Sequence, residues 1–355
     1  MSERSETKAP HGSLSEHSET EAPHRSLSER SETKRGEPTP TQGTRVSSRR
    51  SAPRSTTGTR DTETTRSEPP VEIAPARVGV LGGGRMGAGI AHAFLLSGSR
   101  VTVIERDQQS ADAAAHRVAD SIRRSVDRDD TLDDMTLRSR FTTGTDVTAF
   151  SDCDLVVEAV PEDRVLKAHA LARAESAMAA YAVLASNTSS ISIDDLAADR
   201  LRPAQFLGLH FFNPVPASAL VEIVHGTATS RDVIESARGW VAALGKTPIA
   251  VRDSPGFASS RLGVVLGLEA IRMLEEGVAS AEDIDAAMTL GYRHPIGPLR
   301  TTDIVGLDVR LGIAEELERA FGERFAPPAL LRRMVAEGTL GRKSGRGFYE
   351  WNEER

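Results

Sequence analysis

Two residues on neighbouring predicted strands have side chains suited to proton transfer. His210 ends the apolar run 206–210, and the carboxyl ends of strands in open sheets are where ligands bind. Glu222 lies inside the apolar run 220–224, where an unpaired charge would be costly. A carboxylate bonded to one imidazole nitrogen leaves the other free to exchange a proton, so we expect His210 to be a general base or acid with Glu222 as its partner. The alternative is a structural ion pair between Glu222 and an arginine.

A glycine-rich segment follows one predicted strand directly and opens a helical pattern. A glycine at 82 allows a tight turn, one at 84 allows a pyrophosphate to approach the backbone, and one at 87 allows close packing of helix on strand. This strand–turn–helix context predicts a dinucleotide site rather than a merely structural turn. The expected contacts are Gly82, Gly84, Arg85, Met86 and Gly87.

Glu105 ends the next predicted strand. A carboxylate at this position can accept hydrogen bonds from the adenosine ribose hydroxyls, which favours NAD over NADP. Arg106 could instead accommodate a 2′-phosphate, although a solvent-facing arginine is the simpler interpretation. A nicotinamide dinucleotide beside a proton-accepting histidine predicts oxidation of an alcohol by hydride transfer.

Strands must bring these residues to one edge of a sheet. From Arg77 onward, short apolar runs alternate with helical patterns, as in parallel sheets with crossover helices. The expected strands are 78–81, 101–104, 155–158, 183–186, 206–210, 221–224 and 248–251. Helical periodicity then covers 257–276, 282–290, 307–321 and 329–337. We therefore expect an α/β fold, with a Rossmann-type NAD-binding domain over residues 73–252 and a smaller all-helical domain over 253–355.

The first 72 residues differ from the rest in composition. The run that starts at Ser5 returns at Ser18 and begins again at Ser31, with almost no large apolar side chains. So little apolar surface cannot offset the entropy of ordering the chain, and we expect a disordered low-complexity tail over residues 1–72. A phosphorylation or partner-binding segment is the alternative to a solvated extension or a start codon assigned too early.

Composition excludes several classes of function. The net charge is -7, and no basic cluster is interleaved with aromatic residues, so we expect no nucleic-acid partner. Cys153 is the sole cysteine, which rules out a disulfide framework or a cysteine zinc site and suits the reducing cytoplasm. No apolar run is long enough for a signal peptide or a bilayer span. We expect a cytoplasmic protein with no metal and no membrane contact.

Six segments together resemble the L-3-hydroxyacyl-CoA dehydrogenase family, including its bacterial 3-hydroxybutyryl-CoA dehydrogenase members. They occur in family order between Arg77 and about Trp351, at 78–89, 154–160, 186–190, 208–216, 253–257 and 341–349. The resemblance implies NAD-dependent interconversion of short-chain (S)-3-hydroxyacyl-CoA and 3-ketoacyl-CoA, as in the β-oxidation of fatty acids. It also implies that His210 is the general acid or base and that Glu222 orients it.

The resemblance implies further site residues. Ser189 would bond near the substrate oxygen and the nicotinamide, and Asn213 would help to position the substrate. Ser260 stands where better-known members have a substrate-contacting asparagine, which puts substrate preference in doubt. The implied NAD contacts are Glu162, Lys167, Asn187 and Lys343, and the implied CoA contacts are Ser121 and Arg128, the latter in place of a lysine.

The resemblance also implies a homodimer formed through the helical domain. Apolar residues there, Val264, Leu268, Ile271 and Leu274, could serve either an interface or an internal core. Two other functions stay open. A related NAD-dependent dehydrogenase of a non-CoA hydroxy compound would fail to bind CoA, and a crystallin-like NAD-binding protein would have little turnover, although the intact catalytic residues argue against it.

Overall fold

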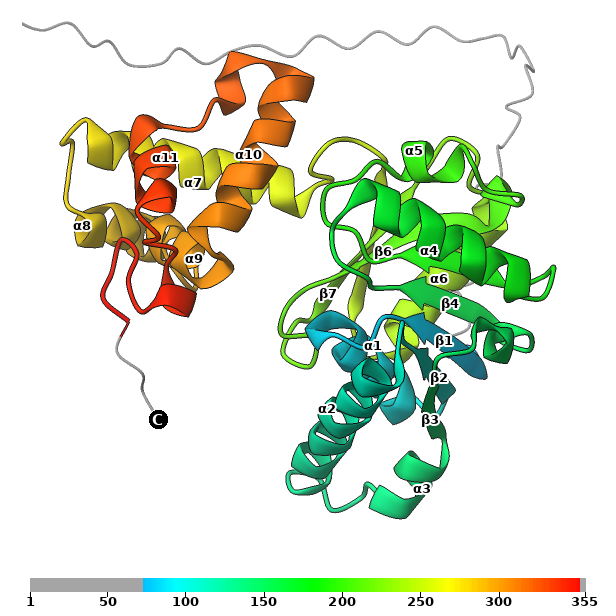
Figure 1. The fold of residues 1–355 in the computed structure, drawn as a ribbon. Helices are drawn as coiled ribbons and strands as arrows, with labels where there is room; N and C mark the ends of the chain where they lie inside the picture. Colours follow the sequence, from blue (N-terminus) through cyan, green and yellow to red (C-terminus); the bar gives the residue numbers. More distant parts are fainter. Residues whose placement is uncertain (1–72, 352–355) are drawn as a thin grey trace, which may run out of the picture. The chain divides into compact units, whose positions relative to one another are not determined.

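The structure, a computed structural model, describes residues 73–351. In this part of the chain eight strands form one sheet in the order β3-β2-β1-β4-β5-β6-β7-β8 (Figure 1). The strands are β1 (Arg77–Leu81), β2 (Arg100–Ile104), β3 (Phe141–Gly144), β4 (Leu155–Glu158), β5 (Val183–Ser186), β6 (Phe206–Phe211), β7 (Leu220–His225) and β8 (Thr247–Arg252). The tail predicted for residues 1–72 lies outside the described residues.

The strand order confirms the Rossmann-type fold. The chain passes from β1 outward to β2 and β3 and then returns to β4, which pairs in parallel with the other side of β1. The loops after β1 and β4 therefore adjoin the point where the strand order reverses, which is where such sheets bind ligands. Strand β3 was not predicted, because its four residues include one large apolar side chain and it pairs at the sheet edge.

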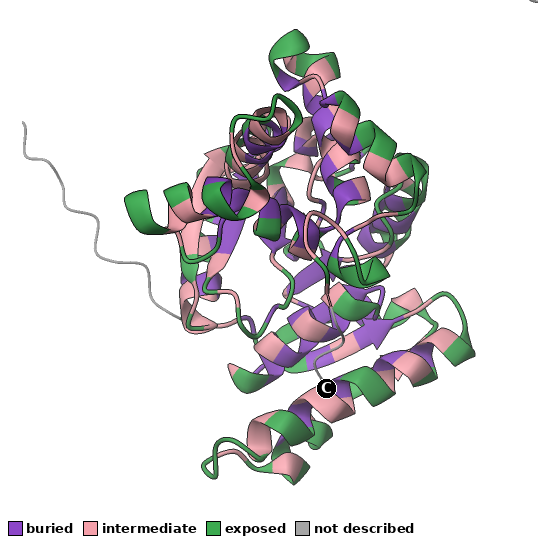
Figure 2. Cartoon of the chain, turned by 90° about the vertical axis from the view of Figure 1, so that its left-hand side faces the viewer, coloured by how far each residue is buried: buried purple, intermediate pink, exposed green. Residues whose placement is uncertain are grey.

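Helices cover both faces of the sheet. They are α1 (Arg85–Leu96), α2 (Gln108–Val126), α3 (Asp134–Ser139), α4 (Arg164–Ala177), α5 (Ile193–Ala197) and α6 (Arg231–Ala243). Apolar side chains of α1, α2 and α6 form one buried cluster with the sheet, and those of α4 and α5 form a second. Figure 2 shows the central strands buried, while the helices expose their outer sides. This two-sided burial explains why the central strands are apolar runs rather than alternating patterns.

The pairing of β6 with β7 differs from the parallel arrangement that the sequence predicted. These strands are antiparallel, because a loop without a helix joins them and allows a direct return. Lys246 fixes this loop, since its ammonium group donates to the carbonyl oxygens of Val215 at 2.7 Å and Ser218 at 2.5 Å. The antiparallel register places His210 directly opposite Glu222.

The described residues after β8 contain helices and isolated bridges, which confirms the all-helical character predicted there. The helices are α7 (Ser259–Glu275), α8 (Ala281–Ala286), α9 (Pro298–Val305), α10 (Leu307–Phe321) and α11 (Ala329–Ala336). Helix α9 was not predicted, because it is short and carries two threonines and an aspartate. Val264, Leu268 and Ile271 are buried in the core of these helices, with Leu274 packed against it.

Candidate active site

The glycine loop lies between β1 and α1 and has the shape that a dinucleotide requires. Gly82 has a φ of 96°, which favours glycine, and a Cβ atom at Gly87 would lie 1.8 Å from the Gly82 carbonyl oxygen. A Cβ atom at Gly84 would meet nothing within 4 Å, so this side of the loop is open. Gly84 also caps α1 without a side-chain acceptor for the first amides of the helix. An open backbone with free amides fits a pyrophosphate.

Glu105 holds this loop from the end of β2. Its Oε1 accepts the Gly83 amide at 2.7 Å, while Arg117 of α2 donates to the Gly83 carbonyl oxygen at 3.2 Å. Arg106 pairs with Asp107 at 3.0 Å and its side chain is 83% exposed, in agreement with the solvent-facing interpretation. A carboxylate at the adenosine end, with the neighbouring arginine already paired, fits NAD. Arg117 was missed because nothing in its local sequence sets it apart.

His210 and Glu222 form a buried pair across β6 and β7. Nδ1 of His210 lies 2.7 Å from Oε2 of Glu222, and the two side chains are 7% and 0% exposed. Burial alone would raise the pKa of Glu222, but hydrogen bonds from His210 and Ser259 hold the pKa below its usual value. Glu222 is therefore a carboxylate and accepts the Nδ1 proton, which leaves Nε2 as the basic nitrogen. The partner of Glu222 is therefore His210 and not an arginine.

One serine and two aromatic rings that contact this pair were not predicted as site residues from the sequence. Ser259, the first residue of α7, donates its hydroxyl to Oε2 of Glu222 at 2.7 Å and its amide to Oε1 at 2.8 Å. The rings of Phe212 and Phe257 lie against the imidazole, with centroid distances of 4.4 Å and 5.8 Å. No sequence signal marks Ser259, because it depends on the fold to bring residue 259 to residue 222.

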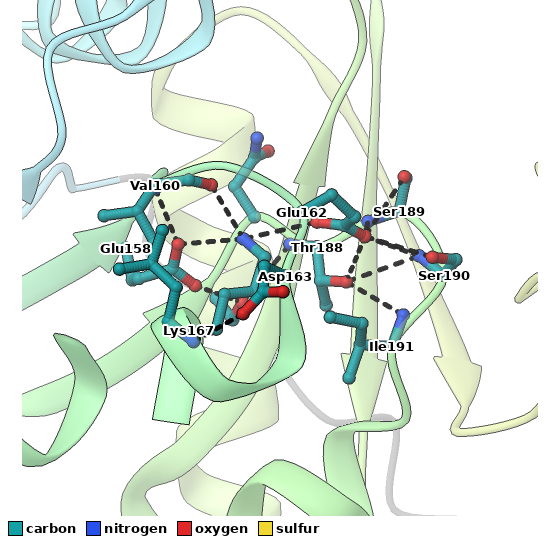
Figure 3. Close-up of polar contacts among 12 residues, drawn as sticks. Glu158, Val160, Glu162, Asp163, Lys167, Thr188, Ser189, Ser190 and Ile191 are labelled. Carbon is teal, nitrogen blue, oxygen red and sulfur yellow. Dashed lines mark hydrogen bonds and ion pairs between the residues drawn. The ribbon is translucent and has the colours of Figure 1, made fainter. Parts of the chain in front are cut away.

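A second polar cluster lies at the carboxyl ends of β4 and β5 (Figure 3). Lys167 of α4 is 1% exposed, and its ammonium group contacts Glu158 Oε1 at 2.8 Å, the Val160 carbonyl oxygen at 3.1 Å and Glu162 Oε2 at 3.3 Å. The ammonium group thus donates two hydrogen bonds within the protein and forms an ion pair with Glu162. This arrangement supports a role for Lys167 in fixing the two carboxylates.

Glu162 links that cluster to the loop that carries Ser189. Oε1 of Glu162 accepts the Thr188 hydroxyl at 2.6 Å and the amides of Ser189 at 2.9 Å and Ser190 at 3.1 Å (Figure 3). Partial burial would raise the pKa of Glu162, but the Lys167 ammonium and the bonds from this loop hold it below its usual value. The Ser189 hydroxyl lies 3.3 Å from the same oxygen. Glu162 is therefore an ionised anchor for the Ser189 loop.

Asn187 joins this loop to the His210 strand. Its side-chain Oδ1 accepts a hydrogen bond from the backbone amide of Phe211 at 2.9 Å. The backbone amide of Asn187 donates to the Glu158 carbonyl oxygen at 2.8 Å. Because β4, β5 and β6 are parallel neighbours, the strand ends that carry these residues lie at one edge of the sheet. Asn213 lies exposed in the β6–β7 loop, and Ser260 is half-buried beside Ser259.

The residues expected to contact CoA lie at the carboxyl end of α2. The Ser121 hydroxyl donates to the Arg117 carbonyl oxygen and accepts from Arg124 at 3.3 Å, while Arg128 is exposed just after the helix. Beneath them, burial together with Arg124 and Arg128 lowers the pKa of His92 to about 4. Arg124, which the sequence did not single out, therefore adds a second cation beside Arg128.

Lys343 lies within the helical domain. Its ammonium group pairs with Asp308 of α10 at 2.5 Å. Asp303 fixes the segment that follows Lys343 by accepting hydrogen bonds from the amides of Phe348 and Tyr349 and from the Trp351 indole N–H at 2.8 to 3.0 Å.

Among residues 73–351 there is no group of three or more metal-ligating side chains, and no helix long and apolar enough to cross a membrane.

The fold and the open glycine loop define a dinucleotide-binding protein of the Rossmann type. Residues 77–254 match the model of the 3-hydroxyacyl-CoA dehydrogenase NAD-binding domain, and residues 256–351 match that of the C-terminal domain of the same enzymes. The chain belongs to the 3-hydroxyacyl-CoA dehydrogenase family. It is an enzyme that acts on a CH–OH group, and its cofactor is NAD.

Individual relatives agree with this assignment. A probable 3-hydroxybutyryl-CoA dehydrogenase of Deinococcus radiodurans is 42% identical over 277 residues, which cover 78% of this chain and 100% of the relative. The solved (S)-3-hydroxybutyryl-CoA dehydrogenase of Ralstonia eutropha is 38% identical with a TM-score of 0.75, covering 79% of this chain and 100% of that chain. A more distant solved structure, a diketoreductase of dicarbonyl compounds, is 27% identical with a TM-score of 0.69 over the same shares.

Proposed function

We propose that the enzyme interconverts short-chain (S)-3-hydroxyacyl-CoA and 3-ketoacyl-CoA, with His210 as general base or acid and Glu222 as its orienting partner. The 2.7 Å contact between Nδ1 of His210 and the buried Glu222 carboxylate is the observation that carries the proposal. The relatives named for 3-hydroxybutyryl-CoA support the substrate class.

In the oxidative direction, Nε2 of His210 takes the proton of the substrate hydroxyl. NAD, when bound, would accept the hydride from the carbon that carries this hydroxyl. As the imidazole becomes positively charged, the Glu222 carboxylate stabilises it, and no reorganisation is needed because four donors already fix that carboxylate. In the reductive direction the same ring returns the proton to the developing alkoxide. The rings of Phe212 and Phe257 limit water around the imidazole.

Other residues have supporting roles in this proposal. Ser189, placed by Glu162, donates a hydrogen bond to the substrate oxygen, with Asn213 and Ser260 near the acyl chain. Glycine-loop amides and Glu105 hold the adenosine half of NAD, and Asn187 positions the nicotinamide end. Glu162 and Lys343 also serve the cofactor, the former mainly through the Ser189 loop that it anchors.

The direct test is NADH consumption with acetoacetyl-CoA at neutral pH. We expect His210→Ala to reduce kcat by roughly 100- to 10,000-fold, which is the usual contribution of a general acid or base. His169→Ala is the matched control, because His169 is exposed on α4 and has no proposed role. NADPH should replace NADH poorly. Undiminished turnover by His210→Ala would refute the proposed base.

A non-CoA hydroxy or dicarbonyl compound is the second candidate substrate. The diketoreductase likeness and the serine at position 260 favour it. The two candidates differ at α2, where Ser121, Arg124 and Arg128 would bind CoA phosphates. If CoA is the carrier, Arg128→Ala should raise KM for acetoacetyl-CoA but leave KM unchanged for a short acetoacetyl thioester without the nucleotide. Equal KM changes for both substrates would favour the non-CoA candidate.

We also propose that the enzyme forms a homodimer through the helical domain. Val264, Leu268 and Ile271 belong to the internal core, so the candidate interface shifts to the neighbouring residues of α7. Leu262 is 71% exposed and Val265 is 45% exposed, one turn apart on that helix. Sedimentation of Leu262→Glu should show monomer if this face is the interface.

Oxidation of fatty acyl chains in the cytoplasm is the proposed physiological setting. The substrate class of the relatives supports a role in the oxidation of fatty acyl chains. The buried free thiol of Cys153 suits a reducing compartment such as the cytoplasm. Fractionation of the source cells, with the enzyme followed by its NADH-dependent activity, tests the location.

A further inference from the structure

The Glu222 carboxylate accepts four hydrogen bonds, and two of them come from Ser259, which has no separate role in the mechanism described above. Oε1 accepts the amides of Ala258 at 3.2 Å and Ser259 at 2.8 Å. Oε2 accepts Nδ1 of His210 at 2.7 Å and the hydroxyl of Ser259 at 2.7 Å. His210 and Ser259 therefore share a single carboxylate oxygen.

The turn between β8 and α7 brings Ser259 to this oxygen. Gly256 and Phe257 have φ values of 72° and 50°, and the helix starts immediately afterwards with Ala258 as its N-cap. Free amides at a helix N-terminus favour a negative charge, which explains the bonds to Oε1. The hydroxyl of Ser259 adds a donor that the helix backbone does not provide.

We propose that Ser259 is a positioning residue that sets the strength of the His210–Glu222 hydrogen bond, and with it the pH at which His210 changes protonation state. The inference rests on the proposed roles of His210 and Glu222. A hydroxyl bonded to Oε2 disperses part of the negative charge that would otherwise stabilise the protonated imidazole. Loss of the hydroxyl concentrates that charge on the bond to His210, so the ring should bind its proton more tightly.

The surroundings leave few other groups that could set this balance. The imidazole is lined by the uncharged rings of Phe212 and Phe257, and β8 places Ile249 opposite Glu222. The charge of His210 is among the causes that lower the pKa of Glu222. Ser259 is thus a neutral donor to a pair that is lined by apolar side chains.

The test uses Ser259→Ala and the hydroxyl-retaining Ser259→Thr, each compared with the unaltered enzyme. In cofactor-free protein, NMR titration of the His210 imidazole should show protonation at a pH about 0.5 unit higher in Ser259→Ala, which corresponds to a roughly threefold change in proton affinity. The acid limb of alcohol oxidation should move by the same amount. Ser259→Thr should titrate at the original pH.

The two reaction directions separate tuning from structural damage. Alcohol oxidation needs the neutral ring and should slow by up to about threefold on the acid limb of its pH profile, whereas ketone reduction needs the protonated ring and should not slow. Ser280→Ala is a matched control, because Ser280 caps the exposed start of α8 by accepting the Asp283 amide. It should leave both the NMR titration and the pH profile unchanged.

Each failure has its own signature. If His210→Ala keeps its turnover, the proposed function itself is overturned. If His210→Ala is inactive but Ser259→Ala titrates at the original pH, or loses both directions equally, only the inference about Ser259 is overturned. A raised protonation pH that Ser259→Thr reverses supports it.

Discussion

Glu158 and Glu222 are both glutamates inside apolar strands, and neither side chain is exposed to solvent. Glu158 is bonded to the Val160 amide, the Ser186 hydroxyl and the Lys167 ammonium, which is itself enclosed by two further oxygens, those of the Val160 carbonyl and Glu162. Glu222 is bonded instead to an imidazole, and no described residue bonds to its second nitrogen. The partner of Glu158 is thus enclosed by protein oxygens, whereas in the proposed function the partner of Glu222 keeps one nitrogen for proton transfer.

The pKa directions of the two glutamates differ accordingly. Burial raises the pKa of Glu158, and the Lys167 ammonium and the other donors offset only part of this effect. For Glu222, burial acts in the same direction but is outweighed by the hydrogen bonds from His210 and Ser259. Three perturbations of these two sites, and one of the Ser189 loop that Glu162 anchors, would test the contrast.

Lys167→Met should have the largest effect. It leaves Glu158 buried without its cation, and breaking a buried pair in this way costs about 3–5 kcal/mol of the free energy of unfolding. Urea denaturation measures the loss. The double variant Glu158→Gln with Lys167→Met removes both charges and should recover part of the stability. If Lys167→Met is as stable as the unaltered enzyme, the structural role assigned to this cluster is wrong.

Glu222→Gln should mainly affect catalysis. A neutral amide cannot stabilise the protonated imidazole, so kcat should fall by about 100-fold with only a small change in KM for NADH. The matched comparison is Glu158→Gln. For this variant, the loss of stability should be larger relative to the loss of kcat than it is for Glu222→Gln. Steady-state kinetics and urea denaturation on the same preparations would show whether the two glutamates separate as expected.

Ser189→Ala should have a smaller effect, because one hydroxyl is lost while Glu162 still holds the loop through the Thr188 hydroxyl and the loop amides. We expect kcat/KM for the acyl substrate to fall by about tenfold with unchanged stability. Ser190→Ala, which removes the neighbouring hydroxyl bonded to the same glutamate, is the control. Equal losses in the two variants would indicate loop anchoring rather than substrate contact.

Lowering the pH should change the stability contributions of the two glutamates in opposite directions, and this effect is smaller than those above. The lowered pKa of Glu222 contributes stability that is present above the unfolded-state pKa and is lost as pH falls through the folded-state pKa. The stability advantage of the unaltered enzyme over Glu222→Gln should therefore shrink in acid. The raised pKa of Glu158 has the opposite sign, since the folded state binds its proton first. The stability of the unaltered enzyme relative to Glu158→Gln should therefore increase as pH falls from neutral. Urea midpoints from pH 7 down to below pH 4 measure both, because the Glu222 effect falls below the usual carboxyl pKa and the Glu158 effect falls above it.

Much of the architecture could be predicted from local patterns. Central strands buried on both faces are continuous apolar runs, and the glycine loop has a motif that depends on its own few residues. Strand β3 and helix α9 escaped because neither has a marked apolar period. Glu222 was identified by its charge within an apolar strand. Glu158 gives the same signal in 155–158 and could have been found in the same way.

The sequence by itself determined the Rossmann-type fold class, the glycine loop and the identity of the buried His210–Glu222 pair, because each is encoded in residues close together or in a charge that burial makes costly. Only the tertiary structure decided that β7 runs antiparallel to β6, that Lys167 is enclosed by three acceptors, and that Ser259 shares an oxygen with His210. These contacts join residues distant in the chain. Their geometry depends on how strands and helices pack, which no local pattern specifies.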